Sequence, residues 1–346
     1  MSATGTRKIP FGPTGLGTSA ARPRPQSTPT GDHRAMLAEV ARAGYPQQIQ
    51  RLTEGFSPGV DEGDVESEAR ALVAELQELG VECDQRLARY LCTFRRLVLP
   101  VEDDALGLDL SRTYLYPTII DDACGRRHSE VFRTLGTGMM KGIVTPARHR
   151  AAADSSLTPN SAAVDYMFNR IAEHCDADFL STHKAFFYQS FIGIMFESQY
   201  AADASDQIDT EYVRNRTGFC EYYFSSLALA YDCLDFTGNL AFWGAALGRM
   251  VDYLNDLNDL ISCYKEFLEG DFPANTVFRR AAHRGTSFLD AYAWTFDRGM
   301  SAYRRILELA NPEQRPHVER YLKGYIHWHL TCGRYRWEEF SRLATT

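Results

Sequence analysis

The sequence predicts an all-α protein built as one helical domain. From about residue 36 onward, apolar side chains recur at intervals of three and four residues, which is the period of an amphipathic helix. Alternating strand patterns are nearly absent, and no internal repeat or long interior linker divides the chain. We therefore expect roughly ten helices in a single bundle, some of them internal and apolar on most faces.

Composition and charge exclude several classes of protein. The chain has 346 residues, 45% hydrophobic and 24% charged, and its net charge of -8 argues against a nucleic-acid-binding surface. Its longest apolar runs, such as 97–101 and 191–196, are far shorter than the ~20 residues of a transmembrane helix. The N-terminus lacks the apolar core of a signal peptide, and the eight cysteines are scattered. We therefore expect a cytoplasmic protein without membrane or nucleic-acid partners.

The first 35 residues differ from the rest. Gly, Pro, Ser and Thr dominate them and no hydrophobic period is present, so residues 1–35 are expected to form a disordered tail. Residues 36–346 are expected to form the helical domain.

The predicted helices follow one another from residue 64. Segment 64–80 opens with acidic residues and stops at Gly80, and the next segment, from Cys83, stops at Pro100. The pair Asp103-Asp104 then indicates a loop or a helix cap. Further helical patterns occupy 161–175, 183–202, 211–234, 239–270, 287–310 and 316–343.

The longest of these helices carries a stripe of oxygen donors. Asn258, Ser262 and Glu266 are spaced i, i+4 and i+8, which places them within about 80° on one helix face. Their amide, hydroxyl and carboxylate oxygens suit Mg²⁺, and Glu266 can lean back toward the helix N-terminus to share an ion. Lys265 is almost in line with Asn258 and adds a cation, which suits a ligand with surplus negative charge such as a diphosphate.

The string N-D-x-x-S-x-x-x-E at 258–266 resembles the metal-binding motif of class I terpene synthases, and "NDLISCYKEF" is most similar to the fungal trichodiene synthase branch. The resemblance implies a helical bundle around a central active-site cavity, three Mg²⁺ ions and a facing aspartate-rich helix. "YLYPTIIDDACGRR" supplies Asp121 and Asp122 as implied metal ligands. Gly125 stands where the family pattern D-D-x-x-D has its last acid, which is a departure from the family.

Two other segments match the family in the expected order. In "EYVRNRTGF", Arg214 with Thr217 and Gly218 fits the diphosphate-sensing arginine, and Arg216 is the competing candidate. Arginine makes planar bidentate contacts with phosphate oxygens, and a glycine there would break the helix locally. "TCGRYRWEE" supplies the arginine-tyrosine pair that the family places near the C-terminus, here Arg334 and Tyr335.

The resemblance implies a Mg²⁺-dependent sesquiterpene cyclase. Such an enzyme ionises farnesyl diphosphate, releases diphosphate and cyclises the carbocation to a hydrocarbon or an alcohol. The implied catalytic residues are Asp121, Arg214, Asn258, Ser262, Glu266, Arg334 and Tyr335. The implied diphosphate-binding residues are Arg214, Lys265, Arg334 and Tyr335. Aromatic faces attract cations, so the expected pocket residues are Tyr114, Phe187, Phe219 and Tyr253, together with Thr217 and Gly218.

Several alternatives stay open. A cyclase for C10 or C20 diphosphates has the same motifs, and a non-catalytic helical scaffold is favoured by Gly125 alone. Chain-elongating enzymes carry a second D-D-x-x-D and class II cyclases a D-x-D-D, and the chain has neither string. His327 and His329 are expected to be packing or surface groups. A homodimer is compatible with the resemblance, although no sequence feature indicates one.

Overall fold

The computed structural model describes residues 31–126, 159–200, 210–270 and 275–345. Within those ranges all regular structure is helical, which confirms the predicted all-α class. The α-helices are α1 (Gly31–Arg42), α2 (Tyr45–Arg51), α3 (Glu62–Glu78), α4 (Gln85–Val98), α5 (Asp104–Arg126), α8 (Pro159–Ile171), α9 (Ala177–Tyr200), α10 (Thr210–Thr217), α11 (Cys220–Ser225), α12 (Leu227–Ala230), α13 (Leu240–Glu269), α14 (Thr276–Arg284), α15 (Phe288–Leu309), α16 (Arg315–Thr331) and α17 (Trp337–Arg342). Short 3₁₀ turns are η1 (Asp232–Leu234), η3 (Gly333–Tyr335) and η4 (Leu343–Thr345).

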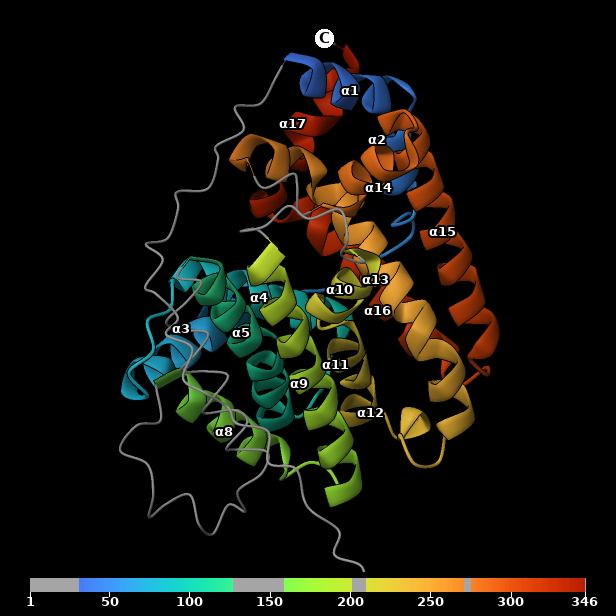
Figure 1. The fold of residues 1–346 in the computed structure, drawn as a ribbon. Coiled ribbons are helices and arrows are strands. Elements are labelled where there is room, and N and C mark those ends of the chain that lie inside the picture. Colours follow the sequence, from blue (N-terminus) through green and yellow to red (C-terminus); the bar gives the residue numbers. More distant parts are fainter. Residues whose placement is uncertain (1–30, 127–158, 201–209, 271–274, 346) are drawn as a thin grey trace, which may run out of the picture.

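The helices form two groups with α10 and α11 between them (Figure 1). Helices α3, α4, α5, α8 and α9 make one group, and α13, α14 and α15 belong to the other. Helix α16 packs on α4 as well as on α13 and α15, so it joins the two groups. The helices that carry predicted motifs, α5, α10 and α13, therefore lie around the middle of the molecule, and α16 leads to the turn η3, which carries Arg334 and Tyr335.

Local sequence signals set several helix ends. The Asp103 carboxylate accepts hydrogen bonds from the backbone N–H groups of Ala105 (2.8 Å) and Leu106 (3.2 Å), which confirms the predicted cap. Helix α13 runs without a break over 30 residues, close to the predicted 239–270, and Gly270 ends it at φ 78°.

The N-terminal boundary differs from the prediction. Helix α1 begins at Gly31, so residues 31–35, expected in the tail, are helical. Contact with the domain explains this extension, because the His33 ring lies 6.1 Å from Phe267 and 6.0 Å from Phe278 between centroids. The rest of the expected tail, residues 1–30, lies outside the described residues.

A network of ion pairs fixes α13 from behind. Asp256 on α13 is fully buried and bonds to Arg280 of α14 (2.9 Å) and to Arg298 of α15 (2.6 Å). Glu211 of α10 bonds to the same two arginines, at 2.9 and 3.2 Å. We call these four residues the rear network. It ties α10, which carries Arg214, to the helix that carries the oxygen-donor stripe.

The helices and the cysteines complete the description of the fold. None of the helices described here is long and apolar enough to cross a membrane. Seven cysteines are free thiols, namely Cys83, Cys92, Cys175, Cys220, Cys233, Cys263 and Cys332.

Candidate active site

A cavity of about 330 Å³ opens between α4, α5, α10, α13 and α16. Most residues predicted for the site line it, although they come from segments far apart in the sequence. They are Tyr114 and Asp121 of α5, Arg214, Thr217, Gly218 and Phe219 around the end of α10, Asn258, Lys265 and Glu266 of α13, and Arg334 and Tyr335 of η3.

Two expected pocket residues lie in the hydrophobic core instead. Phe187 is fully buried, with its ring 5.2 Å from that of Phe168 between centroids. Tyr253 is also fully buried, and its hydroxyl donates to the Leu322 carbonyl oxygen at 2.8 Å. Five residues separate Tyr253 from Asn258, a rotation of about 140° around the helix, so the two side chains point to different faces. The side chain of Asp122 and the surroundings of Gly125 are not among the features that the structure describes.

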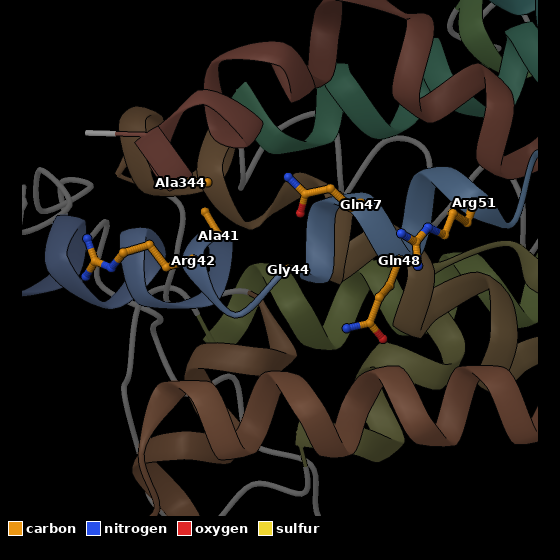
Figure 2. Close-up of a pocket in the computed structure, with 7 residues that line it drawn as sticks. All are labelled: Ala41, Arg42, Gly44, Gln47, Gln48, Arg51 and Ala344. Carbon is orange, nitrogen blue, oxygen red and sulfur yellow. The ribbon is translucent and has the colours of Figure 1, made fainter.

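A second, more open cavity lies elsewhere on the molecule, around the junction of α1 and α2 (Figure 2). Its volume is about 500 Å³, and it contains no acidic residue and no residue of the predicted motifs. It is lined by Ala41, Arg42, Gly44, Gln47, Gln48, Arg51 and Ala344. The cavity between α5 and α13 is therefore the candidate active site.

The oxygen donors of α13 are incompletely paired. We call Asn258, Ser262 and Glu266 the cavity face of α13, although only Asn258 and Glu266 line the cavity and the side chain of Ser262 is buried behind the lining. Asn258 Oδ1 accepts from Arg214 Nη2 (2.9 Å), and Glu266 Oε2 accepts from Asn275 Nδ2 (2.8 Å). The buried Ser262 hydroxyl makes no hydrogen bond of ordinary geometry with a described residue, although it lies close enough to Glu266 to lower the pKa of that carboxyl slightly. An unpartnered oxygen between an amide and a carboxylate oxygen fits a Mg²⁺ site.

Negative charge is concentrated at the same place. Burial, reinforced by the charge of Asp259, raises the pKa of Glu266 to about 7. Asp259 also lines the cavity and pairs with Arg214 at 2.6 Å, although the sequence analysis did not select it. Among the described residues no three His, Cys, Asp or Glu side chains form a metal-binding group, so a metal here would also need the Asn and Ser oxygens.

Helix α10 ends three residues after Arg214, and the Arg214 side chain lines the cavity. Helix α10 ends at Thr217 and α11 begins at Cys220, which confirms the predicted interruption at Gly218. A Cβ at Gly218 would lie 2.2 Å from Asn255 Oδ1, so a larger residue would displace this segment. Arg216 does not line the cavity and donates instead to Gln189 Oε1 at 2.7 Å. Of the two candidate arginines, Arg214 is the one that faces the site.

Aromatic side chains form another part of the cavity lining, which we call the aromatic wall. Two predicted residues, Tyr114 and Phe219, belong to it, and Phe94, Tyr223 and Trp328 complete it. The ring of Phe94 lies 4.9 Å from Tyr114 and 5.0 Å from Trp328, and Tyr223 lies 5.6 Å from Phe219, all between centroids. Rings packed in this way exclude water and present faces that attract cations.

His329 lines the cavity although the sequence analysis did not select it for the site. It was expected to be a packing or surface group, but its Nε2 atom lies 3.1 Å from Asn258 Nδ2. It is 2% exposed, so it is buried as a packing residue would be. Its position five residues before Arg334 was the only signal in the sequence. His327 does pack as expected, against Phe56 at 5.3 Å.

Comparison with known proteins bears on this site. Residues 210–344 match the family model for trichodiene synthase, and this segment contains Arg214, the cavity face and the Arg334-Tyr335 pair. The predicted resemblance to class I terpene synthases is confirmed. Together with the fold, the match supports the predicted terpene synthase, which is a lyase. No curated protein matches the chain by sequence.

Solved terpene synthases share the fold. Linalool/nerolidol synthase from Streptomyces clavuligerus, in complex with 2-fluorogeranyl diphosphate, is 15% identical with a TM-score of 0.61, and the match covers 79% of this chain and 95% of that chain. Germacradien-4-ol synthase from Streptomyces citricolor is 16% identical with a TM-score of 0.58, over 82% of this chain and 94% of that chain. At these identities the likeness extends to the fold alone.

Proposed function

We propose that the protein is a Mg²⁺-dependent sesquiterpene cyclase that ionises farnesyl diphosphate and cyclises the resulting carbocation. One observation carries this proposal. A single cavity is lined by Asn258 and Glu266 of the oxygen-donor stripe, by cationic side chains from three segments and by an aromatic wall. A diphosphate requires the first two features, and a carbocation requires the third.

The metal ligands come from two helices. Asn258, Ser262 and Glu266 of α13 would hold Mg²⁺ on one side, and Asp121 with Asp122 of α5 on the other, as the family's three ions require. When bound, Mg²⁺ neutralises the diphosphate and polarises the allylic C–O bond, so that the bond ionises.

The cationic residues bind and hold the leaving group. Arg214, Lys265 and Arg334 line the same end of the cavity as the cavity face, and the hydroxyl of Tyr335 adds a donor. Arg214 and Arg334 would donate paired hydrogen bonds to phosphate oxygens, which are stronger than single neutral ones. These fixed donors would stabilise charge on the diphosphate as it leaves.

The aromatic wall protects the other half of the substrate. Rings of Tyr114, Phe219 and Tyr223 would exclude water from the carbocation and stabilise it through their faces. A farnesyl chain is favoured by the family match, and C10 and C20 chains are the alternatives.

The free cysteines favour a cytosolic location.

The test is incubation of purified protein with C10, C15 and C20 diphosphates plus Mg²⁺, with products measured by gas chromatography–mass spectrometry. We expect a cyclic C15 product from the unaltered protein and a loss of at least about 10²-fold in turnover for Asn258→Ala. Asn258→Asp, which keeps an oxygen donor, is the matched control and should retain more activity. If the unaltered protein gives no product with any substrate, the scaffold alternative is favoured.

A further inference from the structure

The side-chain amide of Asn258 is held at both ends. Its Oδ1 accepts from Arg214 Nη2 at 2.9 Å, and its Nδ2 lies 3.1 Å from His329 Nε2. Because arginine only donates, the atom facing Arg214 must be the oxygen, and the atom facing His329 must then be the amide nitrogen. The two contacts therefore define one orientation of the amide.

The proton on His329 follows from its other contact. Nδ1 lies 2.8 Å from the Tyr325 carbonyl oxygen, which can only accept, so Nδ1 carries the hydrogen. Nε2 is then free to accept from the Asn258 amide, and the ring is neutral. Burial favours the same neutral form, since it lowers the pKa of His329 to about 3.

Neighbouring rings hold the imidazole in place. Its centroid lies 4.2 Å from that of Tyr325 and 4.5 Å from that of Tyr335, and the edge of Trp328 lies against it at 4.8 Å between centroids. At 2% exposure the ring has little freedom to turn. Nε2 therefore points at Asn258 from a fixed position.

We propose that His329 is a positioning residue that accepts from the Asn258 amide nitrogen and thereby keeps Oδ1 directed toward the metal and diphosphate. This inference rests on the proposed function. Its weight grows when substrate is bound, because Arg214 must then turn toward the diphosphate and release Oδ1. His329 then keeps the amide nitrogen away from the cation, beside the Tyr335 hydroxyl, which also contacts Asn258. Partners of this kind, which orient a metal ligand, typically change metal affinity about 10- to 100-fold.

The experiment measures Mn²⁺ binding in the presence of inorganic pyrophosphate, by electron paramagnetic resonance, with no turnover involved. His329→Phe keeps a buried ring but removes the acceptor, and we expect its Mn²⁺ affinity to fall by about 10-fold or more. His329→Gln supplies an amide oxygen that can accept, and it should recover most of that loss. His327→Phe, on the same helix but outside the cavity, should bind Mn²⁺ as the unaltered protein does.

The Gln variant distinguishes positioning from packing, because a purely structural role would not be rescued by a flexible amide. If His329→Phe does not fold, His329→Leu against His329→Gln makes the same comparison at similar side-chain volume. Equal Mn²⁺ affinity in the unaltered, Phe or Leu, and Gln proteins would overturn the role of His329 while leaving the proposed function intact. No Mn²⁺ binding by the unaltered protein would overturn both.

Discussion

Helix α13 carries buried polar groups on two faces that differ in how well they are paired. On the rear network, both oxygens of Asp256 bond to arginines, Arg280 and Arg298. On the cavity face, the buried Ser262 hydroxyl makes no hydrogen bond of ordinary geometry with a described residue, and burial raises the pKa of Glu266 to about 7. The polar groups of the rear network have their hydrogen-bond partners within the protein, and those of the cavity face do not all have one.

The difference separates groups that stabilise the fold from groups that await a ligand. In the rear network, burial raises the pKa of Asp256 in spite of its two arginines, whereas, against the effect of burial, Arg280 and Arg298 lower the pKa of the less buried Glu211 below its ordinary value. Removing one partner of a buried ion pair of this kind leaves the other charge uncompensated and destabilises the folded protein. On the cavity face, burial and the charge of Asp259 raise the pKa of Glu266, so a bound cation would stabilise the charged form of that carboxyl.

The largest expected effect is on the rear network. Asp256→Ala leaves Arg280 and Arg298 without their buried partner, so we expect a loss of about 3–5 kcal/mol in the free energy of unfolding. Urea denaturation of the metal-free protein measures this. Glu308→Ala breaks the exposed pair with Arg305 and should change stability by less than about 1 kcal/mol. If Asp256→Ala lowers the free energy of unfolding by less than about 1 kcal/mol, as Glu308→Ala is expected to do, the two faces of α13 do not differ in this way.

The contribution of Glu266 to the free energy of unfolding should depend on pH. Its folded pKa of about 7 lies above the ordinary 4.5, so its stabilising contribution is complete below 4.5 and is lost as the pH rises through 7. Glu266→Gln keeps an acceptor for Asn275 without the charge. In the metal-free protein, its stability relative to the unaltered protein should rise between pH 5 and pH 8. We expect this rise in relative stability to be roughly 2 kcal/mol. A shift of one pKa unit corresponds to ~1.4 kcal/mol, and the expected rise is smaller than the whole shift would give because the carboxyl is partly exposed.

Urea denaturation at the two pH values measures that change. Glu338→Gln, at a side chain that is 82% exposed, is the control and should show no such pH dependence. Adding Mg²⁺ with pyrophosphate at pH 8 should stabilise the unaltered protein more than Glu266→Gln, because binding to the folded state adds to its stability. If the difference in unfolding free energy between the two proteins does not change with pH, the pKa of Glu266 is not raised in the folded protein.

Patterns within one helix could be predicted from the sequence, because helix geometry alone determines them. The boundaries of α13, the Asp103 cap and the shared face of Asn258 and Glu266 are of this kind. Contacts between helices could not. His329 reaches Asn258 across 71 positions of sequence, and no spacing rule connects them.

Aromatic residues near a motif were the least predictable. Phe187 and Tyr253 were expected in the pocket because they adjoin the motif helices, yet both are fully buried in the core. Neighbouring positions on a helix are about 100° apart, so closeness in sequence does not place two side chains on one face. Phe94 and Trp328 line the cavity although neither belongs to any motif. The polar end of the site has a sequence pattern, and the aromatic end depends on tertiary packing.

The smallest expected change in stability concerns Ser262. Ser262→Ala removes a buried hydroxyl that makes no hydrogen bond of ordinary geometry with any described residue, so the free energy of unfolding should stay the same or rise, by at most about 1 kcal/mol. Ser225 is the matched control. It is equally buried, but its hydroxyl donates to the Tyr222 carbonyl (2.9 Å) and accepts from His183 (2.8 Å).

Removing that hydroxyl by Ser225→Ala leaves two buried groups unpaired and should cost about 1–3 kcal/mol. Mn²⁺ binding with pyrophosphate should respond in the opposite order, weakened by Ser262→Ala and unchanged by Ser225→Ala. Equal destabilisation by the two substitutions would mean that Ser262 serves the fold as Ser225 does. Asn258 and Glu266, which already bond to Arg214 and Asn275, would then be the remaining oxygen donors of the cavity face for a metal.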